Sequence, residues 1–428
     1  MRIGIIGAGI SGMSAALRLA NQGHEVHVFQ REGEPGGLLA TFDFDGVRIE
    51  HFYHFLCAGD AGYFALCEEL GLGDRIRFEP VRTGFYYDGV CYPFTEPLDL
   101  LRFAPIPFFE RLKFGLFALE ARLRKEWRQL DAIAAKPWLI QRLGQRTYDV
   151  VWEPLLSLKF GEHHERVSAA WIWHRIHRVA KSGGRMGYLD GGTGLLLDSL
   201  AARLKQAGVT LHTYSPVRRI RVADRRVTGL DAEEYGYFEC DRVVSTIPLD
   251  LLAGLLPDAT PSYDRALRAI QYIGVVCVTF KLRQPVSPYF WLNVHDPRVP
   301  MNGIIEYTNL NPIAGPGVHI AYVPYYVPTD HPSYRMRDDD IIRQSWQALK
   351  VIAPQLSDDD LLASHVARAA YAQAICEEGF LNMLPAQESP IAGLWLLDSV
   401  FLYPEDRTQS GQIRKAWEVA DHIHGAGH

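Results

Sequence analysis

The 428-residue chain lacks several features that would assign it to a class by composition alone. Its six cysteines form no Cys-x-x-Cys pair, which argues against structural zinc or a disulfide framework and fits a reducing cytoplasm. The net charge is -6, so no excess of positive charge points to a nucleic-acid partner. No apolar run reaches the roughly 18 residues that a membrane-spanning helix requires. We therefore expect a cytoplasmic protein of about two domains.

The first 29 residues have the pattern of a βαβ unit. The apolar run RIGII (residues 2–6) precedes GAGISG, a helical pattern that ends at Gln22-Gly23, and a second apolar run, EVHVF. With this spacing, Gly7 permits a tight turn, Gly9 lets a pyrophosphate approach the backbone, and Gly12 lets the helix pack on the strand. The pattern predicts that a dinucleotide binds this loop, which consists of Gly7, Ala8, Gly9, Ile10, Ser11 and Gly12.

The residue that follows the second predicted strand is unusual. Gln30 stands where an acidic residue normally holds the ribose hydroxyls of the dinucleotide. An amide can both accept from and donate to a diol, so ribose binding remains feasible without the carboxylate. Two alternatives stay open: Arg31 would favour the 2′-phosphate of NADP, and Glu32 could supply a carboxylate from a shifted backbone.

A glycine pair distinguishes between these alternatives. Gly36 and Gly37 lie six and seven residues after Gln30, a spacing that resembles the flavin-dependent amine oxidase superfamily, which includes protoporphyrinogen oxidase and phytoene desaturase. In that superfamily the pair passes beside the pyrophosphate of FAD. The resemblance implies that Gln30, Arg31, Gly36, Gly37 and Leu38 surround FAD. Leu38 replaces a common arginine, which separates this chain from typical monoamine oxidases.

Two central segments support the resemblance. Residues 188–220 predict a glycine turn, a helix and a strand that ends near Val217, whose backbone would meet the adenine. Residues 240–248, CDRVVSTIP, predict a buried strand and a turn that places Thr246 under the cofactor.

The C-terminal segment implies the remaining cofactor contacts. By resemblance, Asp398 would bind the ribityl and pyrophosphate region, and a turn cap is the alternative role. Ser410, Gly411 and Gln412 would begin a helix whose backbone N–H groups stabilise reduced flavin. Residues 394–415 contain no histidine or cysteine, where some relatives attach flavin, so we expect noncovalent FAD.

These segments imply a discontinuous α/β architecture. A Rossmann-type FAD-binding domain of the amine oxidase/glutathione reductase kind would comprise residues 1–75, 188–260 and 375–428. An interleaved α+β substrate domain would comprise residues 76–187 and 261–374. The stretches RIEHFYHFL and LYPEDR resemble a protoporphyrinogen oxidase-like subgroup that is related to UDP-galactopyranose mutase.

The resemblance implies an FAD-dependent dehydrogenase, desaturase or oxidase. Its substrate would be a small organic molecule, largely apolar or linked to a glycan or isoprenoid. Tyr53 and His54 follow the first cofactor segment and could position substrate or act as base, or could simply be core residues. Glu306 is a second candidate base.

The alternative reaction is a redox-neutral sugar-nucleotide mutation. It would require arginines that clamp a diphosphate, for which the sequence offers Arg283, Arg298 and Arg335 without a distinctive spacing.

Residues 101–127 predict an amphipathic basic helix. Leu112, Leu116, Leu119 and Leu123 recur at helical spacing among arginines and lysines. These leucines could pack in the core beneath snorkelling basic residues, or the helix could lie peripherally on the inner face of a membrane. The histidines of GEHHER (161–166) fit a solvated loop better than a metal site, so we expect no metal.

Overall fold

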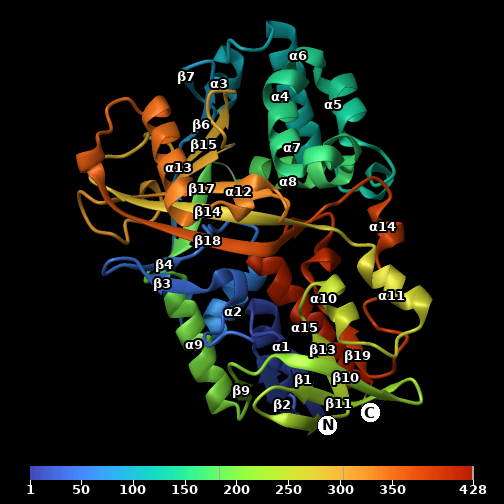
Figure 1. The fold of residues 1–428 in the computed structure, drawn as a ribbon. Helices are drawn as coiled ribbons and strands as arrows, with labels where there is room; N and C mark the ends of the chain where they lie inside the picture. Colours follow the sequence, from blue (N-terminus) through green and yellow to red (C-terminus); the bar gives the residue numbers. More distant parts are fainter. Residues whose placement is uncertain (183, 302, 427–428) are drawn as a thin grey trace.

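A five-stranded parallel sheet forms one half of the molecule in the computed structural model, which describes residues 1–182, 184–301 and 303–426 (Figure 1). In spatial order the strands are β19 (Leu394–Leu396), β13 (Arg242–Ser245), β1 (Arg2–Ile6), β2 (Glu25–Phe29) and β9 (Thr210–His212). They come from the beginning, middle and end of the chain, within the three segments expected to bind the cofactor. The predicted α/β fold class is therefore confirmed.

The alternation of residues in β1 explains how this sheet is covered on both faces. Ile3 and Ile5 pack on one side with three helices, α1 (Ile10–Asn21), α9 (Gly192–Gln206) and α15 (Gln409–Gly425). Gly4 faces the opposite side, where a Cβ atom would lie only 2.7 Å from Leu230 Cδ1. Burial on both faces is the reason that the strand is apolar throughout.

A three-stranded antiparallel meander covers that second face. It consists of β10 (Val217–Ala223), β11 (Arg226–Ala232) and β12 (Gly236–Glu239). The prediction of a strand that ends near Val217 was wrong, because β9 ends at His212 and Val217 begins β10.

A seven-stranded mixed sheet forms the centre of the other half (Figure 1). In spatial order its strands are β18 (Leu361–Ala374), β14 (Tyr272–Leu282), β17 (His319–Val327), β16 (Gly303–Glu306), β15 (Trp291–His295), β6 (Thr83–Tyr87) and β7 (Val90–Pro93). Helix α13 (Asp338–Ile352) packs on one of its faces through Trp346 and Leu349. The strands lie in the two segments expected to form the substrate domain, whose limits remain predictions.

A helical layer lies beside β6 and β15 and above β14 and β18 in the view of Figure 1. Its main members are α4 (Phe108–Leu123), α5 (Ala135–Leu143), α7 (Glu153–Phe160) and α8 (Ala169–Ser182). Shorter helices are α2 (Ala61–Glu69), α3 (Pro97–Arg102), α10 (Leu249–Gly254), α11 (Pro261–Arg268), α12 (Pro332–Arg335) and α14 (Phe380–Met383), and two strand pairs are β3 (Thr41–Asp43) with β4 (Arg48–Glu50) and β5 (Ile76–Pro80) with β8 (Arg185–Leu189).

Helix α4 divides its apolar residues between the interior and the surface. Phe114, Phe117 and Ala121 are buried. The stripe expected from the sequence points outward, with Leu112, Leu116, Leu119 and Leu123 respectively 41, 68, 52 and 69% exposed. The interpretation that this stripe packs in the core was therefore wrong. Among the described residues, no helix has the length and apolar character needed to cross a bilayer.

Candidate active site

A cavity of about 2540 Å³ lies where the two halves meet. Its wall begins at the loop between β1 and α1, passes residues 51–55, and reaches Phe114 and Trp152 in the helical layer. Typical ligand pockets measure about 300–1000 Å³. The cavity can therefore hold a dinucleotide together with a second molecule.

The three glycines of the β1–α1 loop have the distinct environments that dinucleotide binding requires. Gly7 has a φ of +100°, which favours glycine in this tight turn. A Cβ atom on Gly12 would lie 2.0 Å from the carbonyl oxygen of Gly7, so the helix can approach the strand only because this side chain is absent. A Cβ atom on Gly9 would meet nothing within 4 Å and would project into open space. The loop thus fits a pyrophosphate at the N-terminus of α1.

The glycine pair lies directly against this loop. Gly36 forms a parallel bridge with Gly9, and its N–H donates to the carbonyl oxygen of Ala8 over 2.8 Å. Gly36 and Gly37 both have positive φ values, of 129° and 59°. The two glycine motifs therefore line one stretch of the cavity, although Gly36 comes 24 positions after Gly12 in the sequence.

Gln30 connects the loop to an acidic neighbour. Its Oε1 accepts from the N–H of Ala8 at 3.0 Å, and its Nε2 donates to Glu32 Oε2 at 2.7 Å. Arg31 pairs with the same Glu32 carboxylate at 2.6 Å. All three side chains line the cavity. The charge of Arg31 is neutralised and a carboxylate is present, which suits a ribose diol better than a 2′-phosphate.

The other expected cofactor residues are divided between the cavity and the interior. Ile10, Ser11, Leu38, Val217, Thr246 and Gln412 line the cavity, whereas Ala8 and Gly12 support the loop from behind. Ser11 Oγ donates to Gln412 Oε1 at 2.6 Å, which ties the start of α1 to the start of α15. The beginnings of two helices from opposite ends of the chain therefore meet at this wall.

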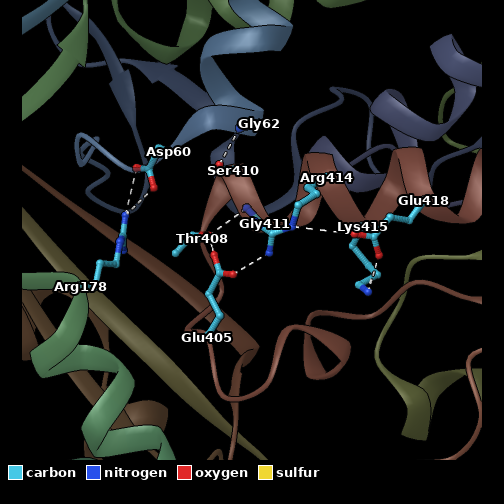
Figure 2. Close-up of polar contacts among 10 residues, drawn as sticks. All are labelled: Asp60, Gly62, Arg178, Glu405, Thr408, Ser410, Gly411, Arg414, Lys415 and Glu418. Carbon is cyan, nitrogen blue, oxygen red and sulfur yellow. Dashed lines mark hydrogen bonds and ion pairs between the residues drawn. The ribbon is translucent and has the colours of Figure 1, made fainter. Parts of the chain in front are cut away.

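The N-terminus of α15 is capped by its own side chains (Figure 2). Thr408 Oγ1 accepts from the N–H of Gly411 at 2.9 Å and donates to Glu405, which also accepts from Arg414. Ser410 Oγ accepts from the N–H of Gly62 at 3.0 Å. Ser410 and Gly411 are buried behind the cavity wall, contrary to their expected role, while Thr408 and Gln409 face it.

Asp398 lines the cavity, but both oxygens of its carboxylate accept hydrogen bonds from other groups of the protein. Oδ1 accepts from the N–H of Val400 at 3.1 Å and from Ser399 Oγ at 3.0 Å. Oδ2 accepts from the N–H of Leu249 at 3.1 Å and from the hydroxyl of Tyr272. Burial raises the pKa of this carboxyl group, and these donors oppose the rise. Capping a turn, the alternative role, describes its contacts better than ribityl binding does.

Tyr53 and His54 both line the cavity. The hydroxyl of Tyr53 lies 3.4 Å from that of Tyr326 on β17. Burial, together with the positive charge of Arg407, lowers the pKa of His54 to about 3, so its imidazole is neutral at physiological pH. A neutral imidazole with so low a pKa is a weak base, which favours a positioning role over proton abstraction.

Glu306 does not reach the cavity. It ends β16, where Ile305 faces the cavity and the next residue points to the opposite side. Its Oε2 accepts from the N–H of Val286 at 2.9 Å, and burial raises its pKa to about 8. The prediction that Glu306 is a substrate base was therefore wrong. Arg283, Arg298 and Arg335, the candidates for a diphosphate clamp, also lie outside the cavity lining.

The histidines of GEHHER have protein partners. His163 Nδ1 lies 2.8 Å from Glu377 Oε1, and His164 Nδ1 lies 2.8 Å from the carbonyl oxygen of Gly161. Over the described ranges, no group of three or more His, Cys, Asp or Glu side chains is placed to hold a metal ion.

Several polar residues of the cavity carried no recognisable signal in the sequence. Lys159, Arg175, Asp406 and Arg407 line its wall together with Tyr326. Helices α7 and α8, strand β17 and the loop before α15 supply them, so no local spacing unites them. The LYPEDR stretch contains two of the five, but the resemblance did not assign them a role.

Comparison with known proteins identifies the family to which the chain belongs. The parallel sheet and its glycine loops define a dinucleotide-dependent class of protein. The family described as flavin containing amine oxidoreductase matches residues 10–396, and the chain therefore belongs to that family. The resemblance inferred from the glycine motifs is confirmed, and flavin is the cofactor of the family.

Several curated proteins that are similar to this chain are desaturases. The 15-cis-phytoene desaturase of Synechococcus elongatus is 27% identical over 305 residues, which cover 64% of this chain and 64% of that protein. This desaturase and two zeta-carotene desaturases that also match are covered over 64 to 66% of their own lengths.

Solved structures share the fold along the whole chain. A putative protoporphyrinogen oxidase from Exiguobacterium sp. 255-15 superimposes with a TM-score of 0.80 at 18% identity, covering 99% of both chains. A reduced UDP-galactopyranose mutase gives 0.79 at 16% identity, covering 99% of this chain and 96% of that one.

Proposed function

We propose that this protein is an FAD-dependent dehydrogenase, desaturase or oxidase. The observation that carries the proposal is the open space at Gly9, bordered by Gly36 and Gly37 at the N-terminus of α1. FAD would lie along this wall, with its ribose at Gln30 and Glu32 and its adenine near Val217. Bound there, FAD would supply the hydride acceptor that the side chains lack.

Noncovalent binding of FAD is part of this proposal. Cys57 and Cys277 are the thiols on the cavity wall. Burial raises the pKa of Cys57 to about 11 and that of Cys277 still further, so both stay protonated and are poor nucleophiles. Cys376, which is nearer to the C-terminal cofactor segment, lies outside the cavity lining.

The protein itself would bind and orient the substrate and exclude water. Beyond the glycine loops, the cavity is lined by apolar and aromatic side chains, including Phe85, Phe94, Phe114, Trp152 and Leu155. Such walls exclude water and favour a largely apolar substrate. Relatives named for phytoene and zeta-carotene support a substrate with an extended apolar body.

Peripheral contact with a lipid bilayer would bring such a substrate to the cavity. Exposed apolar residues gather on α3 and α4, and these are Leu98, Leu101, Phe108, Phe109, Leu112, Leu116, Leu119 and Leu123. Arg122 and Lys125 lie beside them and would attract anionic lipid headgroups. Leu119 and Ala118 also line the cavity, so the same helix would join the membrane surface to the substrate site.

Anaerobic stopped-flow spectroscopy of the flavin-loaded protein tests the proposed reaction class. Phytoene, zeta-carotene and apolar amphiphiles would be mixed with oxidised protein. Net bleaching of the flavin by a substrate supports a redox reaction. Turnover of a sugar nucleotide only after the flavin has been reduced beforehand, with no net oxidation, would instead establish the mutase reaction.

A further inference from the structure

Three cationic side chains share one wall of the cavity. Lys159 and Arg407 lie over the ring of Tyr326, with Nζ and Cζ respectively 4.4 and 5.6 Å from the ring centroid. Lys159 and Arg175 both lie over the ring of Trp171, at 5.1 and 4.8 Å. Two aromatic rings thus hold the three cations side by side, and all three line the cavity.

The protein supplies too little negative charge for this cluster. Arg175 Nη1 pairs with Asp406 Oδ2 at 2.5 Å. Arg407 donates from Nη2 to the hydroxyl of Tyr326 at 3.0 Å, but its Nη1 is buried without a partner. Within the described part of the chain, Lys159 Nζ has no hydrogen-bond or ion-pair partner, and the residue is only 5% exposed. One carboxylate therefore faces three cations.

Neighbouring acidic residues do not correct this imbalance. Asp60 is paired with Arg178 at 3.1 Å, and Glu405 accepts from Arg414 and Thr408 at the start of α15 (Figure 2). Their charges are therefore already matched.

The aromatic rings alone do not offset the cost of burying these cations. A cation–π contact is weaker than the cost of removing an ion from water. Burial lowers the pKa of Lys159 well below its ordinary value, Arg175 and Arg407 lower it further, and Asp406 opposes them. An anion that enters the cavity would pair with the free donors, favour the protonated form of Lys159 and restore the charge balance.

We propose that Lys159 and Arg407 form a subsite for an oxyanion, a carboxylate or phosphate group, at one end of the substrate. Arg175, held by Asp406, contributes to the positive potential of this wall. The inference rests on the proposed function and narrows its substrate class. The substrate would be an amphiphile with an acidic end at these cations and an apolar body along Phe114, Val151, Trp152 and Leu155, which also line the cavity.

Equilibrium titration of the flavin-loaded protein tests this subsite without turnover. The probes are decanoate, decyl phosphate and 1-decanol, which share one apolar chain and differ in the end group. Calorimetry or perturbation of the flavin absorbance gives each dissociation constant. We expect one or both anions to bind at least about tenfold more tightly than decanol, as charge-assisted hydrogen bonds do. The two anionic probes distinguish a carboxylate from a phosphate substrate.

Substitutions at the cluster locate the effect. Lys159→Met keeps an unbranched side chain that is one atom shorter and removes the charge, so we expect about 10- to 100-fold weaker anion binding and little change for decanol. Lys159→Arg should restore the preference. Arg82→Met removes an exposed arginine from another part of the cavity lining and should leave the preference unchanged. Flavin content and thermal unfolding would be measured for each variant.

Equal affinity of the wild type for decanol and both anions would overturn the subsite, and this comparison needs no variant. Unchanged anion affinity in Lys159→Met would also overturn it. A changed flavin reduction potential with an unchanged anion preference would do the same, because Lys159 would then interact with the flavin and not with a substrate anion. Tighter binding of UDP than of decyl phosphate would contradict the proposal that the substrate has an apolar body. None of these outcomes depends on substrate oxidation, so they are distinct from failure of the proposed reaction.

Discussion

The two halves of the molecule differ in how their functional residues are related along the chain. In the half that contains the parallel sheet, here called the cofactor half, Gly7, Gly9 and Gly12 lie within six residues. Each has the environment that its position in the motif implies. In the other half, which contains the mixed sheet and the helical layer, Lys159, Arg175 and Tyr326 come from three separate elements and meet only through the fold. The first arrangement is encoded locally, and the second depends on tertiary packing.

Asp398 gives the sharpest exception to this contrast, because it belongs to the cofactor half but has structural contacts. Asp398→Ala would leave the N–H groups of Leu249 and Val400 and the hydroxyl of Tyr272 without their acceptor. We expect it to lower the free energy of unfolding by about 3–4 kcal/mol, since each buried unpaired group costs about 1–3 kcal/mol. Thermal or urea unfolding of the protein measures this loss.

Asp398→Asn is the matched control, because it keeps one acceptor oxygen and should cost less. If Asp398→Ala unfolds as the wild type does but loses flavin, the carboxylate is a cofactor ligand. Asp398 would then no longer be an exception to the contrast between the two halves.

Gly9 and Gly12 separate binding from folding within a single motif. Gly9 has a φ of -72° and open space before it, so Gly9→Val should fold normally while its side chain occupies the expected position of the pyrophosphate. We expect about 100-fold weaker FAD binding, measured by titrating the flavin-free protein. Gly12→Ala should instead affect folding. It should lower the free energy of unfolding, because its Cβ atom would lie 2.0 Å from the Gly7 carbonyl oxygen. Normal FAD affinity in Gly9→Val would contradict the proposed path of the cofactor.

The fold and the cofactor wall were therefore predictable where short motifs impose backbone geometry. The Gly36–Gly37 pair was recognisable because close backbone approach and positive φ leave little choice of residue. Residues with ordinary backbone geometry were harder to assign. Glu306 follows a cavity-facing residue on β16, and a shift of one residue on a strand reverses the side.

The outward leucine stripe of α4 shows a second limit of prediction. Helical spacing defines an apolar stripe, but it does not say whether a core, a partner or a membrane covers that stripe. The helix buries its other apolar side, with Phe114 and Phe117. The sequence pattern alone could not show which of the two apolar sides faces the core.

Glu32 offers a smaller test on the cofactor side. If Glu32 supplies the carboxylate that Gln30 lacks, Glu32→Gln should weaken FAD binding about tenfold by removing a charge-assisted hydrogen bond to the ribose. Glu34→Gln is the control, because Glu34 also lines the cavity but contacts Gln30 only through its backbone carbonyl oxygen. A gain of NADP binding without a loss of FAD affinity would show that Arg31 defines the site instead.

The smallest expected effect concerns the surface of α4. Leu116→Ser and Leu123→Ser should each reduce binding to anionic phospholipid vesicles a few-fold, because each leucine would bury only part of its apolar area in the interface. Stability should change by less than about 0.5 kcal/mol, as is usual for exposed positions. Val351→Ser, at a 44% exposed position on α13, is the control. Vesicle sedimentation that is equal for all three variants and the wild type would exclude membrane contact through α4.

Release of the cofactor by acid tests whether this cavity binds FAD without a covalent bond. The purified protein would be precipitated with acid, and the flavin in the supernatant and pellet would be quantified and identified by mass. We expect one FAD per chain, released completely into the supernatant. A yellow pellet would contradict noncovalent binding, and a protein that neither purifies with FAD nor binds added FAD would contradict the assignment of this cavity to a flavin.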